Sequence, residues 1–410
     1  MNLNNPAYRV FLLFCIFVVA SCSNDDNVQA PIPNDATAVC ENGLAGSYPC
    51  DNYDLMGFLS IEELAGSDAR GNDCWGWTDP ITRKEYALFC ATTGVAFVDI
   101  SIPKTPVLIG KLPTATINSV WRDIKVFNNY AFIVADNAEG HGMQIFDLTR
   151  LRDVPNPPIN FTADNLFKDF GSAHNIVINE DSGFAYAVGT SRLEVFEGGP
   201  LFIDINTPLS PISSGGFIGY SHDAQAVMYS GPDTEHNGKE ILIGSNENEV
   251  VIVDVSDKNN PKQLSTISYS NVGYTHQGWF TEDMRYFILG DELDEIRMGN
   301  KTRTIIFDFA DLDNPKLHTI YFGPSDAVDH NGYVKGNSYF LANYTAGMRV
   351  IDLTDIENKN LTEVGFFDTH PENNNTSFDG AWSVYPYFPS GNIIISDINR
   401  GLFIVRKSAN

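Results

Sequence analysis

The sequence predicts an all-β protein, a seven-bladed β-propeller formed by one domain from residue 40 to residue 410. A short apolar segment recurs along the chain at intervals of about 51 residues, which is the size of one propeller blade. β-Branched and aromatic residues fill the copies, and no segment keeps a sustained helical period. The N-terminal segment also offers a strand that the last copy lacks, so the ring can close without an exposed sheet edge.

The recurring segment ends in an aspartate in six of its seven copies, whereas the last copy, at residues 401–407, carries Arg406 there. The aspartates are Asp99, Asp147, Asp204, Asp254, Asp308 and Asp352. A carboxylate at a strand end can accept hydrogen bonds from backbone N–H groups of the turn that follows. We therefore expect a structural role for these aspartates, with metal binding as the alternative.

Each repeat supports four strands, two ahead of the Asp-ending strand and one behind it with Gly or Ser near its middle. The last copy runs out of chain at Asn410 before a fourth strand. Leu55 to Ile61, "LMGFLSI", matches the fourth strands in character and in its central glycine. We expect this segment to complete the seventh blade.

Residues 1–21 resemble a lipoprotein signal peptide. The apolar run at 10–20 is too short to span a bilayer, and small residues precede Cys22. Cys22 is the expected lipidated N-terminus, with an ordinary cleaved secretory signal as the alternative. Residues 22–39 are rich in Pro, Asn and Asp and read as a flexible tether. The acidic residues behind Cys22 resemble the surface-export signal of Bacteroidetes lipoproteins, which implies an outer-membrane lipoprotein exposed on the cell surface.

Four cysteines follow the tether, and an even count in an exported chain favours disulfides. Cys40 and Cys50 bracket a short loop, whereas Cys74 and Cys90 flank a predicted hairpin that would place them opposite one another. Three pairings are possible, and we expect Cys40–Cys50 and Cys74–Cys90.

The formal net charge of −26 excludes nucleic acid as a natural partner, because such binding needs basic surface. Neutral glycans, cations or basic protein surfaces fit this charge better, although an acidic surface also serves solubility alone.

The Asp-ending strands are close to "LVIVD", the motif of a family of repeat-containing surface proteins. Longer strings, among them "GVAFVDIS", "PVLIGKLPT", "GMQIFDLTRLR" and "GYSHDAQ", resemble the choice-of-anchor B proteins across essentially the whole mature chain. That resemblance implies an exported, propeller-like repeat domain with a variable surface anchor, here the lipid on Cys22. It implies no particular reaction.

Half of the eight histidines fall on one position of the predicted first strand in four consecutive repeats: His174, His222, His276 and His330. The last repeat places Asp379 there, and Asp123 lies two residues beyond Trp121, which holds this position in an earlier repeat. First strands line the channel of a propeller, so these residues could converge at its mouth and hold one divalent transition metal. The alternative is that the imidazoles bond to neighbouring blades and hold them in register.

Catalytic motifs such as G-x-S-x-G and H-E-x-x-H are absent from the sequence. Trp75, Tyr344 and Tyr387 could stack on sugars or belong to the core. The leading interpretation is a lipid-anchored, cell-surface, non-catalytic binding or scaffolding module for protein or glycan partners. The alternative is a metal-dependent hydrolase or lyase that uses the channel histidines.

Overall fold

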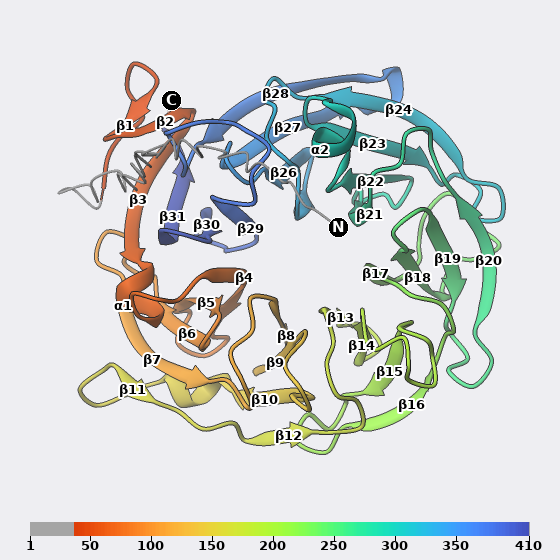
Figure 1. Ribbon diagram of the computed structural model, residues 1–410, viewed down its shortest axis with the longest axis horizontal. Helices are drawn as coiled ribbons and strands as arrows, with labels where there is room; N and C mark the ends of the chain where they lie inside the picture. The colour runs from red at the N-terminus through yellow and green to blue at the C-terminus, as the bar shows by residue number, and fades with distance from the viewer. Residues whose placement is uncertain (1–36, 410) are drawn as a thin grey trace, which may run out of the picture. The chain divides into compact units, whose positions relative to one another are not determined.

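Seven antiparallel sheets surround a central channel in the computed structural model, which describes residues 37–409 (Figure 1). The predicted signal peptide, the predicted lipidation site Cys22 and most of the predicted tether lie outside the described residues. Within the described residues, no helix combines the length and apolar character needed to cross a membrane. Ordered pairing begins at Ala38, whose backbone exchanges hydrogen bonds with Leu55.

The first four blades are each formed by four strands, counted outward from the channel, and β11 between the last two strands of blade 2 joins blade 1. Blade 1 contains β4 (Gly71–Thr78), β5 (Glu85–Ala91), β6 (Gly94–Asp99) and β7 (Val107–Pro113), extended by β11 (Ile159–Asn160). Blade 2 contains β8 (Arg122–Phe127), β9 (Tyr130–Ala135), β10 (Met143–Asp147) and β12 (Asn165–Phe167). Blade 3 contains β13 (Asn175–Asn179), β14 (Phe184–Val188), β15 (Leu201–Asp204) and β16 (Ile212–Gly216). Blade 4 contains β17 (Asp223–Met228), β18 (Glu240–Ser245), β19 (Val250–Asp254) and β20 (Lys262–Ile267).

The remaining blades follow the same plan, and two of them also use N-terminal strands. Blade 5 contains β21 (Thr275–Phe280), β22 (Tyr286–Asp291), β23 (Arg303–Asp308) and β24 (Lys316–Phe322). Blade 6 contains β25 (Gly332–Lys335), β26 (Ser338–Ala342), β27 (Met348–Asp355) and β28 (Asn360–Phe367), extended by β2 (Tyr48–Asp51) and β1 (Leu44–Ala45). Blade 7 contains β29 (Ala381–Tyr385), β30 (Asn392–Asp397), β31 (Gly401–Lys407) and β3 (Tyr53–Ser60). The short helices are α1 (Ile61–Ala65), α2 (Asp294–Met298) and the 3₁₀ turns η1 (Leu148–Leu151) and η2 (Ile356–Asn358).

The ring closes as the sequence predicted. The N-terminal strand β3 pairs antiparallel with the C-terminal strand β31, and the two lie side by side in Figure 1. Every innermost strand contacts the innermost strand of the next blade, including β29 of blade 7 with β4 of blade 1. The outer edge of β31 is therefore covered by β3, which gives the last blade its fourth strand.

The predicted disulfide between Cys40 and Cys50 is confirmed, with a Cα–Cα distance of 6.0 Å. It closes the loop around the β1–β2 hairpin, which continues the outer edge of blade 6.

The second disulfide was predicted wrongly, because Cys74 and Cys90 are buried free thiols. The expected hairpin does form from β4 and β5, but Cys74 pairs with Phe89 in the ladder rather than with Cys90. Side chains alternate between the two faces of a strand, so Cys74 and Cys90 point to opposite sides of the blade. Cys74 packs toward blade 7 and Cys90 toward blade 2.

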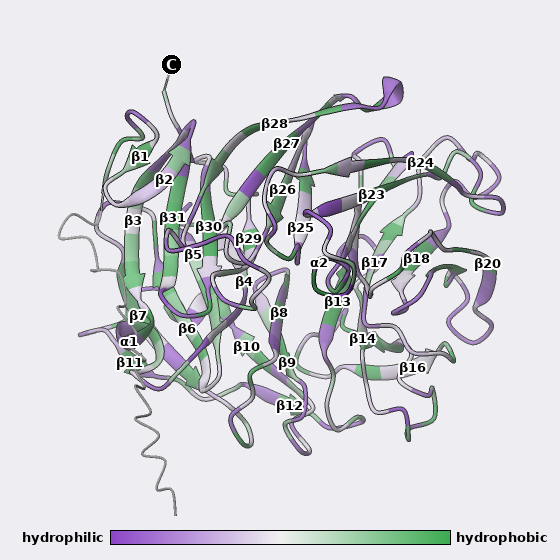
Figure 2. Cartoon of the chain, turned by 45° about the horizontal axis from the view of Figure 1, so that its top comes forward, coloured by the Kyte–Doolittle hydropathy of each residue, from purple (hydrophilic) through white to green (hydrophobic). Residues whose placement is uncertain are grey.

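Apolar clusters fill all seven seams between neighbouring blades of the described domain. Figure 2 shows hydrophobic residues along most strands and hydrophilic residues in the connecting loops. At the seam of blades 1 and 2, the rings of Phe97 and Phe146 stack with centroids 4.6 Å apart. Both faces of each blade are therefore buried, so consecutive residues of inner strands such as β5 are buried and do not alternate with exposed ones.

All six strand-ending aspartates take the structural role predicted for them. Each carboxylate accepts a hydrogen bond from the backbone N–H two residues further on, at 2.9–3.1 Å. The donors are the amides of Ser101, Thr149, Asn206, Ser256, Ala310 and Thr354.

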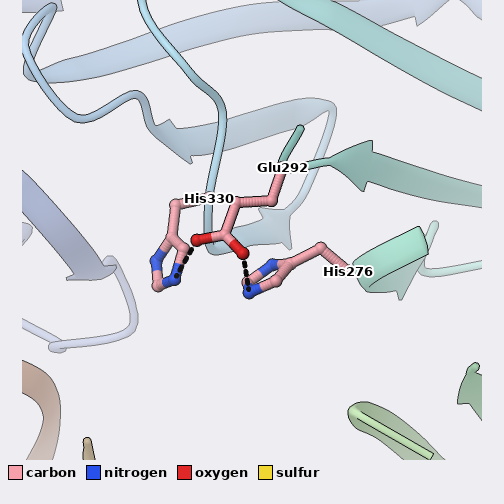
Figure 3. A group of neighbouring side chains, drawn as sticks. All are labelled: His276, Glu292 and His330. Carbon is pink, nitrogen blue, oxygen red and sulfur yellow. Dashed lines mark ion pairs between the residues drawn. The ribbon is translucent and has the colours of Figure 1, made fainter. Parts of the chain in front are cut away.

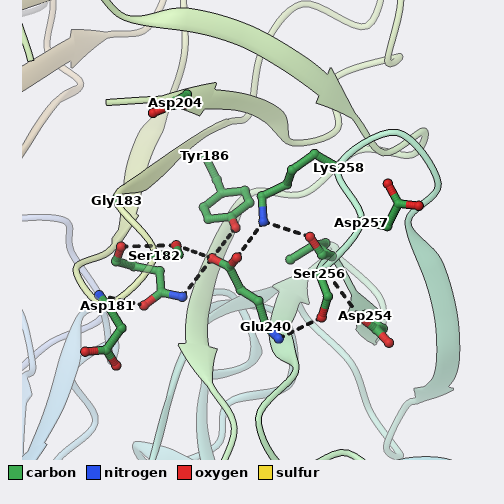
Figure 4. A network of polar contacts seen from close by, with 12 residues as sticks. Asp181, Ser182, Gly183, Tyr186, Asp204, Glu240, Asp254, Ser256, Asp257 and Lys258 are labelled. Atoms are coloured by element: carbon green, nitrogen blue, oxygen red, sulfur yellow. Dashed lines mark hydrogen bonds and ion pairs between the residues drawn. The ribbon is translucent and has the colours of Figure 1, made fainter. Parts of the chain in front are cut away.

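A buried glutamate joins blades 3 and 4 (Figure 4). Glu240, at the start of β18, accepts hydrogen bonds from Asn179 at 2.7 Å, Ser182 at 2.6 Å and Tyr186 at 2.5 Å, and pairs with Lys258. Glu85 occupies the same position in β5 and accepts hydrogen bonds from Ser390 of blade 7. The closing seam, between blades 7 and 1, thus repeats the glutamate contact found between blades 3 and 4.

Candidate functional site

The four recurring histidines form a continuous arc at one end of the channel, here called the histidine end. Ring centroids are 4.2 Å apart for His174 and His222, 4.5 Å for His222 and His276, and 4.4 Å for His276 and His330. Each histidine lies at or just before the start of an innermost strand, from β13 to β25. The sequence therefore identified four side chains that do meet in space.

The outer two histidines of the arc bond to neighbouring blades. His330 Nδ1 lies 2.6 Å from the carbonyl oxygen of Trp382 in blade 7, and His174 Nδ1 lies 3.1 Å from Asp136 in blade 2. The Nδ1 atoms of His222 and His276 are buried without a hydrogen-bond partner. Inter-blade bonding thus accounts for two of the four imidazoles and leaves the middle two open to another role.

Glu292 lies between His276 and His330, and Figure 3 shows its carboxylate directed at both rings. Its Oε2 is 3.7 Å from His276 Nε2, and its Oε1 is 3.6 Å from His330 Nε2. One ligand atom from each of the three residues lies within 4.8 Å of the others. Glu292 follows β22, and Tyr344 holds it by donating to Oε1 at 2.9 Å.

Burial dominates the protonation of this cluster, because it disfavours the charged forms. Burial raises the pKa of Glu292 to about 7 and lowers the pKa of His330 to about 3, partly offset by the Trp382 carbonyl. Burial, and then the neighbouring imidazoles, place the pKa values of His222 and His276 well below the ordinary value. Neutral imidazoles are the form that binds metal ions.

The two predicted carboxylates of the site lie elsewhere. Asp379 precedes β29, pairs with Arg70 at 3.7 Å and accepts a hydrogen bond from Asn399. Ladder pairing shows why: Ala381 pairs with Asp397 in blade 7 as Thr275 pairs with Asp291 in blade 5. Trp382, not Asp379, therefore takes the place of His276 in blade 7. The ring of Trp382 packs edge-on against His330, with centroids 4.8 Å apart.

Asp123 links blades instead of joining the histidines. Its carboxylate pairs with Lys125 at 2.6 Å and accepts a hydrogen bond from the backbone N–H of Ile176 in blade 3 at 2.8 Å. Gln277 makes the equivalent contact from blade 5 to the backbone N–H of Gly332 in blade 6. Asp123 and Gln277 therefore hold neighbouring blades together in these two seams.

A cavity of about 410 Å³ opens beside the histidine end. Glu292, Tyr344 and Trp382 contribute to its wall, together with Arg70 and the exposed Trp121. A ligand in this cavity would therefore reach the carboxylate between His276 and His330.

The other end of the channel holds a second cavity of about 420 Å³, here called the aromatic cavity. Five aromatic residues line it: Trp75, Trp279, Tyr333, Tyr385 and Tyr387. The polar side chains in its wall include Glu180, Glu282 and Gln225. Trp75 and Tyr387 are two of the aromatic residues for which the sequence left sugar stacking and a core position open. The rings of Trp279 and Tyr333 meet at 5.0 Å.

The remaining histidines lie outside the channel arc. His236 pairs with Asp313 at 2.8 Å, and with Asp233 it forms a second group of three ligand atoms. Lys239 also contacts the free nitrogen of His236 at 3.1 Å. This group joins the β17–β18 and β23–β24 loops, and its contacts are those of an inter-blade ion pair.

The fold and the channel together define the protein as a seven-bladed β-propeller with a cavity at each end. The sequence matches no protein-family model and no curated protein. Among solved structures, the hydrazine synthase of Kuenenia stuttgartiensis is similar, with a TM-score of 0.53 at 12% identity over 79% of this chain and 93% of that chain.

Two further structures are similar in fold. One is a Bacteroides fragilis protein described as a candidate 6-phosphogluconolactonase, with a TM-score of 0.53 at 13% identity over 80% of this chain and 92% of that chain. The other is a functionally unknown protein from Desulfotomaculum acetoxidans, with a TM-score of 0.54 at 10% identity over 79% and 94% of the two chains. At such identities the likeness establishes the propeller fold alone.

Proposed function

We propose that this propeller is a lipid-anchored module of the outer cell surface that binds glycan chains in its aromatic cavity without altering them. The composition of the aromatic cavity is the main support for this proposal. Aromatic faces stack on the C–H faces of sugar rings, whereas carboxylates and amides bond to hydroxyl groups. The cavity combines these features, since Trp75, Trp279 and Tyr387 are only partly buried and Glu180 and Glu282 lie beside them.

Location and anchoring rest on the sequence. The lipobox-like residues before Cys22, the acidic residues behind it and the resemblance to the choice-of-anchor B proteins all support export and a lipid anchor.

The size of the aromatic cavity also suits a ligand. Its volume of about 420 Å³ lies within the range of roughly 300–1,000 Å³ typical of small-molecule sites.

The test is calorimetric titration of the purified protein with neutral hexaoses of glucose, xylose and mannose. We expect saturable binding of at least one of them and a loss of affinity of at least about tenfold in Trp279→Ala, because a stacking surface is removed. Trp121→Ala is the matched control, since Trp121 lines the cavity at the opposite end. No binding to any hexaose, or an equal loss in both variants, contradicts the proposal.

The second candidate is a metal-dependent hydrolase or lyase, favoured by the contact of Glu292 with His276 and His330. It differs from the binding module in releasing products. New reducing ends after prolonged incubation with the same hexaoses, abolished in Glu292→Gln, would support it in place of binding alone.

A further inference from the structure

The group formed by His276, Glu292 and His330 joins blades 5 and 6 at the histidine end. His276 belongs to β21, Glu292 follows β22, and His330 precedes β25. The imidazoles are 2% and 4% exposed, and the carboxylate between them is 18% exposed. Three separate segments thus direct nitrogen and oxygen atoms toward one small volume.

The position of the ring hydrogen of His330 leaves a nitrogen lone pair facing the carboxylate of Glu292. The carbonyl of Trp382 can only accept, so His330 Nδ1 carries the ring hydrogen and Nε2 of the neutral ring presents a lone pair. That lone pair faces Glu292 Oε1 at 3.6 Å, and Tyr344 already donates to the same oxygen. His276 makes no hydrogen bond through its buried Nδ1, and its Nε2 lies 3.7 Å from Glu292. A cation at the common point would satisfy these atoms together.

We propose that His276, His330 and Glu292 bind one divalent transition-metal ion and leave a coordination position open toward the adjacent cavity. Two imidazoles with one carboxylate suit zinc, cobalt, nickel or ferrous iron, whereas calcium and magnesium prefer oxygen ligands alone. The open position would take water or an oxygen of a ligand in the cavity that Glu292 lines.

Neighbouring groups fix two of the three ligands. The Trp382 carbonyl orients the His330 ring, and the Tyr344 hydroxyl orients the Glu292 carboxylate. Hydrogen bonds of this kind hold a metal-binding ring and its tautomer in place and contribute about 10–100-fold to metal affinity.

Acidic side chains are also buried behind the site. Asp291, Asp294, Glu295 and Asp329 are buried close to Glu292, and Arg303 is the cation that pairs with Asp291 and Asp294. Both carboxylate oxygens of Asp329 lack a hydrogen-bond partner.

The experiment titrates the purified protein, free of any histidine tag and treated with a chelator, with Co²⁺ and follows its visible absorption. We expect one ion per chain and a loss of affinity in both Glu292→Gln and His276→Asn of at least about 10–100-fold, the cost of removing a group that only orients a ligand. Electron paramagnetic resonance of Cu²⁺ bound in place of Co²⁺ should show coupling to imidazole nitrogen, and this coupling should weaken in His276→Asn.

Asp313→Asn is the control, because it alters the other group of three ligand atoms among the described residues. Circular dichroism verifies that each variant is folded. If His276→Asn does not fold, Glu292→Gln alone tests the proposal. Binding below about a tenth of an ion per chain, or binding lost in Asp313→Asn and retained in Glu292→Gln, overturns the proposal. The inference is independent of glycan binding, which concerns the opposite end of the channel.

Discussion

Individual carboxylates of the domain differ in protonation because burial and neighbouring charges act on each of them differently. Burial, with the nearby Asp123 carboxylate, raises the pKa of Asp223 to about 7. Arg152 instead hydrogen-bonds both oxygens of Asp79 and holds the pKa of that carboxyl well below its usual range. Asp223 therefore stabilises the folded state at low pH, whereas Asp79 stabilises it at higher pH.

Asp223→Asn tests the raised pKa in chelator-treated protein without ligand. Folded Asp223 binds a proton more tightly than the unfolded chain does, so its stabilisation is complete below about pH 4 and is lost as the pH rises through about 7. We expect the free energy of unfolding of Asp223→Asn, relative to the wild type, to increase by about 1–3 kcal/mol between pH 5 and pH 8. Urea unfolding at the two pH values measures it.

Asp326→Asn serves as the control for this series, because the Asp326 side chain is 67% exposed. Its difference from the wild type should stay within about 0.5 kcal/mol at both pH values. A pH-independent difference for Asp223→Asn would contradict the assigned protonation.

The outermost strands fit against the turn that follows the Asp-ending strand of the next blade. A Cβ on Gly57 of β3 would lie 2.0 Å from the carbonyl oxygen of Pro103 in blade 1, and one on Gly215 of β16 would lie 2.5 Å from that of Lys258 in blade 4. In blade 4 the same place holds Ser265, whose hydroxyl donates to the Leu312 carbonyl of blade 5. This contact explains the Gly or Ser that recurs in the fourth strand of the repeat.

Gly57→Ala tests the contact at the closing seam. The added methyl group meets backbone that cannot move independently of the blade, so we expect a loss of about 1–3 kcal/mol in the free energy of unfolding. Gly140→Ala is the matched control, because no atom lies within 4 Å of a Cβ at that position. Denaturant unfolding compares the two, and equal stabilities would show that the β3 seam does not depend on this glycine.

The whole domain is a ring whose two channel ends differ in chemistry, with histidines and a carboxylate at one end and aromatic rings at the other. Closure uses the N-terminal strand β3, and Ala38, near the start of the described residues, pairs with Leu55 of that strand in blade 7. An anchor at Cys22 would therefore connect to the domain through that blade.

Cys22→Ser tests the anchor in cells that export the protein. We expect the variant to move from the detergent-soluble membrane fraction to the soluble fraction, because a lipid chain contributes about 0.8 kcal/mol per buried CH₂ and the serine carries none. Cys15→Ser is the control and should remain with the membrane. Membrane retention of Cys22→Ser, or a mature protein without lipid by mass spectrometry, would contradict the anchor.

Much of the fold was predictable because it repeats locally. The aspartate that ends each third strand bonds to the next turn, and the composition of the apolar segments by itself predicts strands.

The candidate site was predictable only in part. Glu292 carries no repeat signal, since it follows β22 of a single blade and meets His330 only after blade 6 has packed beside blade 5.

The sequence by itself determined the strand period, the number of blades, the closing strand β3 and the position that brings four histidines together. These properties depend on residues close in the chain and on their recurrence. The tertiary structure decided that Cys74 and Cys90 face opposite seams, that Trp382 replaces Asp379 beside His330, and that Glu292 lies between two imidazoles. Ladder register and blade packing set these contacts, and a shift of one residue in register reverses the face on which a side chain lies.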